Sequence, residues 1–398
     1  MLIDRRHWLR CAATAGFGLA LGPGCSRQPP SGGQSEADAP LRFPGKVPLR
    51  VLGDRPPNLE TPWRYFRDDL TPNEAFFVRW HLQFIPTSVD LRTWRLRVAG
   101  HVDRPLELSL HDLRGMEPAS VVAVCQCSGN SRGLFEPHPA GGQWTNGAMG
   151  NARWTGVPLR DLLRRAGVKA GAVDVAFAAL DRSGYPTVPD FTKSLHVDKA
   201  REPDILVAYE MNGEPLPMLN GFPVRLIVPG WYSTYWVKAL AEITVLPKAF
   251  DGFWMSKAYR IPTTPNAVES PTHLAEKTVP INRLNVRSFF TSPAAGSHVP
   301  VDAACPLSGI AFDGGDGIRR VEVSADGGAT WREAELGPDH GRFSFRRWRL
   351  TWRPERDGHH RLLVRATGGA GETQPATAGW NRSGYMRNVI EELPIDVA

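Results

Sequence analysis

The chain has 398 residues, of which 42% are hydrophobic and 22% are charged, a composition typical of globular proteins rather than of disordered or fibrous ones. This length favours two or three domains. The formal net charge is +6, but the basic residues are scattered and form no run of five or six, so nothing in the sequence indicates nucleic-acid binding.

The first 26 residues resemble a secretion signal. Paired Arg5 and Arg6 precede an apolar stretch and then small residues, and this stretch is too short to span a membrane. The arginine pair, with an aromatic residue and a leucine close behind, resembles the twin-arginine export signal. We therefore expect residues 1–26 to direct export to the periplasm and to leave a mature chain without a membrane span. Cys25 is a candidate for a lipid anchor.

Residues 27–60 are rich in Pro, Gly, Ser and Gln and are interpreted as a linker followed by an extended lead-in. Residues 61–268 then mix strand and helix patterns. The alternating "TWRLRVAG" predicts a strand, and "SLHDLRGM" predicts a helix start from its Ser and Asp three positions apart. "VPLRDLLRRAGV" predicts a helix from its leucine spacing, and "VRLIVPG" predicts a short buried strand.

Residues 269–398 have a different character. "RRVEVSADGGATWREAEL" predicts a strand, an Asp-Gly-Gly turn and a second strand. "FSFRRWRLTWRP" and "HHRLLVRATGG" alternate apolar and polar residues. This succession of short strands indicates an immunoglobulin-like β-sandwich, so the whole chain is predicted to be of the α+β class.

The segment "VVAVCQCSGNSRG", residues 121–133, places Cys125 and Cys127 at the end of an apolar run. Their spacing is too short for a zinc half-site, and no haem-attachment histidine follows. A thiolate at a strand end, beside backbone amides and Arg132, lies in an electropositive setting that suits a soft-metal ligand. Taken alone, the pattern fits a buried structural cysteine at least as well.

The surroundings of Cys127 resolve this ambiguity. "CSGNSR", followed by "QWTNGAMGNARWTGVPLRDLL", closely resembles the sulfite oxidase family of molybdenum enzymes. The resemblance implies that Cys127 binds molybdenum, which is held by one pterin per metal, and that Cys125 has no matching role. It also implies a mixed α/β molybdopterin domain followed by a dimerisation-type β-sandwich.

Four further segments resemble the family's motifs. "NEAFFVRWH" maps Arg79 onto a substrate-site arginine and His81 onto a residue near the metal and the pterin. "NGFPVRLIVPGWYSTYWVK" resembles the segment that contacts the pterin pyrophosphate, where Arg225 and Lys238 match and Asn220 stands in place of a frequent His. "FWMSKAYR" maps onto the family's active-site tyrosine, and "GWNRSGYMRN" resembles the end of its dimerisation domain.

The remaining candidate residues are assigned to the substrate or to the pterin. Tyr259, the tyrosine of "FWMSKAYR", could hydrogen-bond the substrate or pass a proton. Sulfite is a small anion, so Arg79 and Arg132 are expected to clamp it through fixed positive charge. Asp181 and Ser183 are expected to lie along the pterin, although a simple turn explains them equally well.

The resemblance implies oxidation of sulfite to sulfate. The chain contains no C-x-x-C-H haem motif and no cytochrome-like stretch before residue 60, so we expect no haem in this chain and a separate c-type cytochrome as electron acceptor. The β-sandwich is a candidate homodimer interface. Two alternatives remain open at this point: a periplasmic reductase of methionine sulfoxide or another S-oxide, and an exported binding lipoprotein without enzymatic activity.

Overall fold

The structure of the protein is a computed structural model, which describes residues 41–398. The expected signal peptide, Cys25 and residues 27–40 of the predicted linker lie outside the described residues. None of the helices in the described part of the chain is long and apolar enough to cross a membrane.

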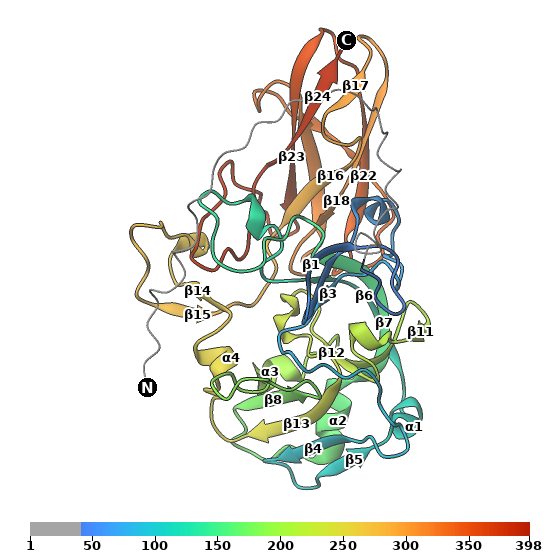
Figure 1. The fold of residues 1–398 in the computed structure, drawn as a ribbon, viewed down its shortest axis with the longest axis vertical. Helices are drawn as coiled ribbons and strands as arrows, with labels where there is room; N and C mark the ends of the chain where they lie inside the picture. The colour runs from blue at the N-terminus through green and yellow to red at the C-terminus, as the bar shows by residue number, and fades with distance from the viewer. Residues whose placement is uncertain (1–40) are drawn as a thin grey trace, which may run out of the picture. The chain divides into compact units, whose positions relative to one another are not determined.

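The first part of the described chain is built on three sheets (Figure 1). A small antiparallel sheet contains β1 (Arg50–Asp54), β2 (Pro57–Glu60) and β3 (Val78–Arg79). The second sheet has the order β11 (Glu214–Pro215), β10 (Leu206–Met211), β7 (Met149–Pro158) and β6 (Ala119–Gln126), with β12 (Arg225–Ile227) also paired to β10. The third has the order β5 (Leu106–Leu108), β4 (Leu96–Gly100), β13 (Leu240–Leu246), β8 (Asp174–Ala179) and β9 (Thr192–His196).

Helices are short and lie between these strands. Within residues 41–398 the α-helices are α1 (Leu110–Arg114), α2 (Leu159–Ala166), α3 (Val197–Ala200) and α4 (Phe253–Ser256). The 3-10 turns of the same part are η2 (Trp63–Arg67), η3 (Arg132–Leu134), η4 (Met218–Asn220), η5 (Ser233–Tyr235) and η6 (Pro265–Ala267). A two-stranded ribbon of β14 (Arg260–Pro262) and β15 (Thr278–Pro280) follows α4.

Local chemistry explains the predicted elements. Ser109 caps α1 through a reciprocal capping box with Asp112, which satisfies amides that the first helical turn leaves without partners. Helix α2 buries Leu159, Leu162 and Leu163 and ends at Gly167, whose φ of 71° is readily adopted by glycine. The predicted strands of "TWRLRVAG" and "VRLIVPG" are confirmed as β4 and β12.

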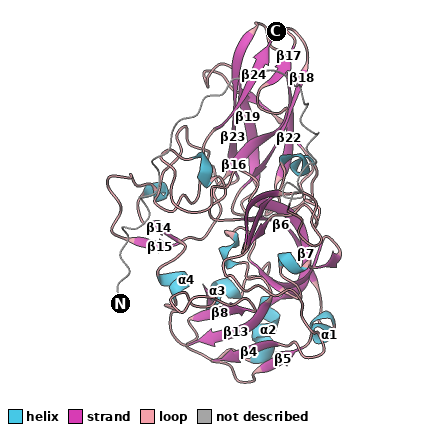
Figure 2. Cartoon of the chain, in the orientation of Figure 1, coloured by secondary structure: helices cyan, strands magenta, loops and turns pink. Residues whose placement is uncertain are grey.

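The C-terminal part is a two-sheet sandwich, as predicted (Figure 2). One sheet has the order β16 (Arg287–Ser292), β18 (Cys305–Phe312), β22 (Arg346–Trp352) and β21 (Glu335–Leu336). The other has the order β17 (Ser297–Val299), β24 (Glu391–Val397), β23 (Gly358–Gly368), β19 (Ile318–Ser324) and β20 (Arg332–Glu333). The hydrophobic interior of the sandwich includes Phe290, Trp348 and Leu362.

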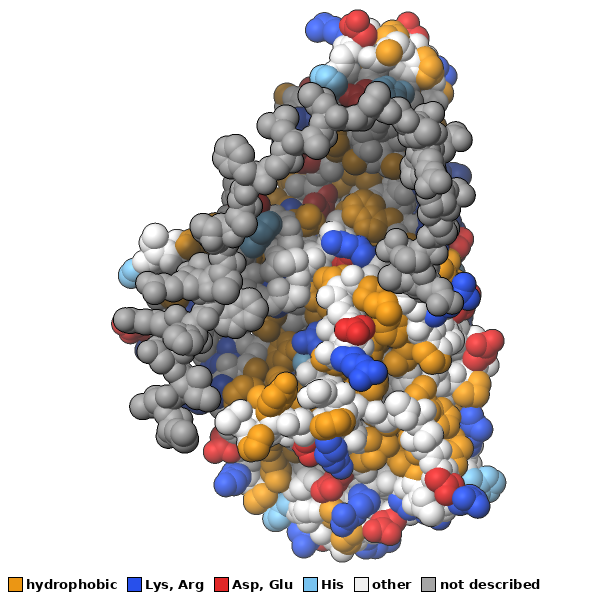
Figure 3. All heavy atoms as spheres, in the orientation of Figure 1, with side chains coloured by type: hydrophobic (Ala, Val, Ile, Leu, Met, Phe, Trp, Pro, Cys, Tyr) orange, Lys and Arg blue, Asp and Glu red, His pale blue; other side chains and the backbone are white. Residues whose placement is uncertain are grey.

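The two parts share buried apolar contacts. Phe289, Ile310 and Phe345 of the sandwich belong to the same hydrophobic cluster as the core of the first part. On the face seen in Figure 3, Lys and Arg side chains are interspersed with Asp and Glu side chains rather than gathered into one basic field.

Candidate active site

One cavity brings together residues that are far apart in the sequence. Of the ten predicted site residues, seven line it: Arg79, His81, Cys127, Asn220, Arg225, Lys238 and Tyr259. The lining is completed by four residues that were not predicted from the sequence: Phe77, Ser128, Ser233 and Thr234. The cavity lies where β3 and β6 end and β12 begins, so ends of strands from two sheets supply its walls.

The two thiols at the end of β6 have different surroundings. Cys127 follows the last strand residue, and its amide donates to the carbonyl of Ala148 at 2.9 Å. Its side chain lines the cavity. Cys125 is buried, and its Sγ accepts from Arg225 Nη2 at 3.8 Å. Burial raises the pKa of the Cys125 thiol, so this side chain is a packed group beside Arg225 while Cys127 faces the open space.

Tyr259 and His81 form a hydrogen-bonded pair on the cavity wall. The Tyr259 hydroxyl contacts His81 Nε2, and the His81 ring stacks on Phe191 with 4.2 Å between ring centres. Burial, together with the nearby charge of Arg79, lowers the pKa of His81 well below its ordinary value. The imidazole is therefore neutral near pH 7, with one ring nitrogen available to accept a proton.

Tyr259 is held in an unusual conformation. Its φ of 56° lies in the left-handed region, which is uncommon for a residue with a large side chain. The ammonium group of Lys193 lies 5.4 Å from the centre of the Tyr259 ring and 4.6 Å from that of Tyr235. Lys193 also donates to the Trp254 carbonyl at 2.7 Å, so the tyrosine is fixed from several sides.

Basic side chains line the cavity and lie buried around it. Arg225 and Lys238 line it, and burial lowers the pKa of each side chain. Burial also lowers the pKa of Lys46 and Lys193 to about 7. A buried cation is costly unless an anion compensates it. The carboxylate of Asp181 partly offsets the effect of burial, because its charge raises the pKa of Lys238.

Asn220 occupies the position at which a histidine is frequent in the family that the sequence resembles. Its Oδ1 accepts from Lys46 Nζ at 2.6 Å, and its Nδ2 donates to the Phe77 carbonyl at 3.0 Å. Arg225 donates to the Asn220 carbonyl at 2.9 Å. The lead-in segment thus reaches the site through Lys46, a contact that nothing in the local sequence indicated.

The other three predicted residues lie outside the cavity lining. Asp181 is buried, its Oδ1 has no hydrogen-bond partner among the described residues, and burial raises its pKa while Lys238 opposes this. Ser183 forms a local turn by accepting from the Tyr185 amide at 3.1 Å, as the alternative reading expected. Arg132 is 9% exposed, and its guanidinium lies beside the ring of Tyr385 in the C-terminal domain.

The chemistry of these groups fits a phosphate-bearing cofactor. Within the described residues, the buried Ser128 Oγ, Thr234 Oγ1 and Arg225 Nε have no hydrogen-bond partner. Buried polar atoms are rarely left in this state. Two hydroxyls and a guanidinium beside Lys238 are suitable partners for pyrophosphate oxygens, and the Cys127 thiol is a suitable soft-metal ligand at the same cavity.

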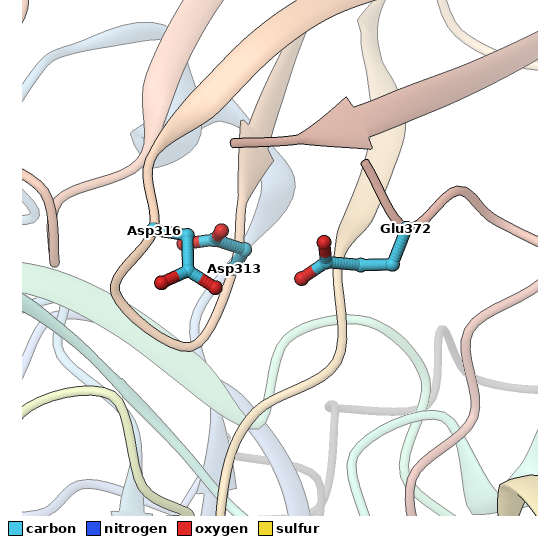
Figure 4. Close-up of side chains that lie close together, drawn as sticks. All are labelled: Asp313, Asp316 and Glu372. Atoms are coloured by element: carbon cyan, nitrogen blue, oxygen red, sulfur yellow. The ribbon is translucent and has the colours of Figure 1, made fainter. Parts of the chain in front are cut away.

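A second group of potential ligands lies in the sandwich (Figure 4). Asp313, Asp316 and Glu372 place carboxylate oxygens within 4.8 Å of one another. The Arg283 guanidinium already forms an ion pair with Asp316, and Asp313 Oδ1 accepts from the amides of Gly315 and Gly317. This cluster is explained by loop structure and Arg283.

The fold and the cavity define a cofactor-binding protein with an appended β-sandwich. Residues 81–254 match the family described as oxidoreductase molybdopterin binding domain, and residues 278–397 match the Mo-co oxidoreductase dimerisation domain. The chain therefore belongs to the sulfite oxidase family of molybdopterin oxidoreductases. This identifies an enzyme scaffold rather than the binding lipoprotein that the sequence alone left open.

Curated relatives and a solved structure agree with this assignment. The chain is 33% identical to mitochondrial sulfite oxidase of Mus musculus, over 91% of this chain and 67% of the relative. It is 36% identical to sulfite oxidase of Gallus gallus, over 88% and 78%. The crystal structure of the sulfane dehydrogenase SoxCD from Paracoccus pantotrophus superposes with a TM-score of 0.72 at 26% identity, covering 92% of this chain and 93% of that one.

Proposed function

We propose that this protein is a periplasmic molybdenum-dependent sulfite dehydrogenase. It oxidises sulfite to sulfate with an oxygen atom from water and releases two protons and two electrons, and the electrons pass one at a time to a c-type cytochrome. The observation that carries the proposal is a cavity lined by the basic side chains of Arg225 and Lys238, with the Cys127 thiol in the same lining. Such a cavity suits an anionic cofactor and a small anionic substrate together.

The chain's own residues would hold the cofactor at two places. Cys127 provides the thiolate ligand to molybdenum. Arg225 and Lys238, with the hydroxyls of Ser128 and Thr234, provide donors for the pyrophosphate. When bound, the cofactor supplies the oxygen-atom transfer to sulfite and accepts the two electrons.

Arg79 and the Tyr259–His81 pair act on the substrate. The guanidinium of Arg79 offers planar, permanently charged donors to a sulfur oxyanion. The Tyr259 hydroxyl donates a hydrogen bond at the cavity wall, and neutral His81 accepts a proton through it. This pair therefore provides a route by which a proton released from water leaves the reacting centre.

Export and the acceptor rest on sequence features. The arginine pair within residues 1–26 supports export of the folded, cofactor-loaded chain by the twin-arginine route, and the absence of a C-x-x-C-H motif supports an external haem protein as acceptor. Whether Cys25 carries a lipid can be read from the mass of the mature N-terminus. The β-sandwich supports a homodimer, which sedimentation of the purified protein tests.

The proposal is tested on protein produced with its molybdenum-cofactor maturation machinery. Molybdenum content and sulfite-dependent reduction of cytochrome c are measured on the same sample, with reduction of methionine sulfoxide by a low-potential donor as the competing assay. We expect stoichiometric molybdenum and sulfite oxidation. Molybdenum-loaded protein that reduces methionine sulfoxide and leaves sulfite unchanged would refute the proposal in favour of the reductase.

A further inference from the structure

A loop of the C-terminal domain reaches the wall of the active-site cavity. The loop comprises residues 380–388 and belongs to the motif "GWNRSGYMRN". Within it, Tyr385 lies with its ring parallel to that of Tyr259, at 2° and with 5.8 Å between ring centres. The second domain thus contributes an aromatic group next to a residue that lines the cavity.

The loop is anchored firmly enough to position a side chain. Arg382 forms a two-pronged ion pair with Glu269, with distances of 2.9 and 2.6 Å. The Trp380 indole donates to the Pro137 carbonyl at 2.8 Å. Within the loop, Asn381 donates to the Tyr385 carbonyl and accepts from its amide. Charge-assisted and reciprocal hydrogen bonds of this kind fix a loop without regular secondary structure.

Tyr385 also contacts Arg132, the second arginine expected to bind the anion. The guanidinium carbon of Arg132 lies 5.3 Å from the centre of the Tyr385 ring, within the range of a cation–π interaction. Burial raises the pKa of the Tyr385 hydroxyl, while the charge of Arg132 and a hydrogen bond from it act in the opposite direction. The tyrosine therefore stays protonated and in contact with Arg132.

The Arg132 side chain is held in place by contacts along its length. Its Nε donates to the Ser383 carbonyl at 2.9 Å, and its Nη1 lies 3.3 Å from the Gly142 carbonyl. A Cβ added at Gly384 would lie 2.6 Å from Arg132 Cγ, and one at Gly141 would lie 2.5 Å from Nη1. Both glycines have a positive φ, 115° at Gly141 and 58° at Gly384, which favours glycine, and the arginine lies in a narrow slot between the two domains.

We propose that Tyr385 is a substrate-positioning residue contributed by the C-terminal domain: it fixes the Arg132 guanidinium and covers Tyr259, so that the anion meets both groups in one orientation. This inference rests on the proposed oxidation of sulfite, because it assigns Arg132 to the binding of the sulfur oxyanion. It explains why a domain of the dimerisation type is tied to the catalytic site through residues 380–388.

The test uses the full-length, molybdenum-loaded enzyme with Tyr385→Phe and Tyr385→Leu. We measure KM and kcat for sulfite and the inhibition constant of sulfate, which reports anion binding without turnover. The matched control is Tyr209→Leu, because Tyr209 also has an arginine near its ring, Arg114 at 5.7 Å, yet it does not line the cavity.

We expect Tyr385→Leu to raise the sulfite KM and the sulfate inhibition constant together, by about tenfold. Tyr385→Phe should raise both by about threefold because it keeps the ring. The value of kcat should change less than KM, molybdenum content should stay normal, and the control should match wild type. In an Arg132→Met background, Tyr385→Leu should raise the sulfate inhibition constant less than it does in wild type, since part of its effect is exerted through Arg132.

Three results would overturn the inference. The first is wild-type KM and sulfate inhibition for Tyr385→Leu. The second is a loss of molybdenum and kcat with KM unchanged, which indicates a structural role alone. The third is full additivity with Arg132→Met. If the wild-type enzyme oxidises sulfite, none of these three results affects the proposed function. A molybdenum-loaded wild-type enzyme that does not oxidise sulfite would refute both the proposed function and this inference.

Discussion

The assignment of Arg225 to the cofactor pyrophosphate makes a prediction that separates cofactor binding from folding. The Arg225 side chain is 3% exposed, and it donates to the carbonyls of Asn220 at 2.9 Å and Trp236 at 3.3 Å. Its guanidinium also lies 5.0 Å from the centre of the Trp154 ring. Arg225→Met keeps the length and apolar stem of the side chain and removes the charge.

The substitution is expected to change the stability of the cofactor-free protein less than it weakens cofactor binding. In cofactor-free protein, the substitution leaves two carbonyls without a donor, at a cost of about 1–3 kcal/mol each. It also relieves the burial of a charge, which offsets much of that cost. In the loaded protein, the lost charge-assisted hydrogen bond is worth about 1.5–3 kcal/mol, which corresponds to a roughly 10- to 150-fold weaker hold on the cofactor.

The assay follows loss of molybdenum and pterin during dialysis of the loaded protein, with thermal unfolding of the cofactor-free protein in parallel. The control is Arg365→Met, since Arg365 stacks on Trp331 at 4.0 Å and pairs with Glu322 in the sandwich. We expect Arg225→Met to lose the cofactor faster while the control retains it. Folded Arg225→Met that keeps molybdenum as long as wild type would refute the reasoning.

Three further predictions concern charge. Arg79→Ala should raise the sulfite KM at least tenfold at normal molybdenum content; unchanged kinetics would contradict its assignment to the substrate. Arg382 lowers the pKa of Glu269 to about 2. Glu269→Gln should therefore lower the free energy of unfolding by about 1–2 kcal/mol at pH 6. In urea unfolding, this difference between variant and wild type should disappear as the pH falls from 4.5 to 2. Burial lowers the pKa of Lys46 and Lys193 from 10.5 to about 7, so between these pH values the unfolded chain binds more protons than the folded protein. The Tm of cofactor-free protein should therefore rise from pH 7 to 9. A Tm that falls over this range would contradict the prediction.

Local signals in the sequence were sufficient for much of the fold. The Ser109–Asp112 pair and the leucines before Gly167 each predicted a helix that the structure contains. The alternating segments after residue 269 predicted the sandwich strands. The pairing of strands distant in sequence carries no such signal, and the parallel contact of β13 with β4 is an example.

The site was predictable only where contiguous motifs carried it. Cys127 and Arg79 were found through such motifs, and both line the cavity. Lys46 reaches Asn220 across 174 residues, and Tyr385 meets Tyr259 from another domain. Contacts of this kind depend on tertiary packing, so no spacing or periodicity in one chain could have indicated them.

The central claim is tested most directly by comparing wild type with Cys127→Ser, both produced with the cofactor maturation machinery. Molybdenum, pterin and sulfite-dependent cytochrome c reduction are measured on the same samples. The account predicts that wild type contains molybdenum and oxidises sulfite, while Cys127→Ser retains pterin and has no turnover. Undiminished sulfite oxidation by Cys127→Ser would contradict the role of the thiolate, and absence of molybdenum from active wild type would contradict the account as a whole.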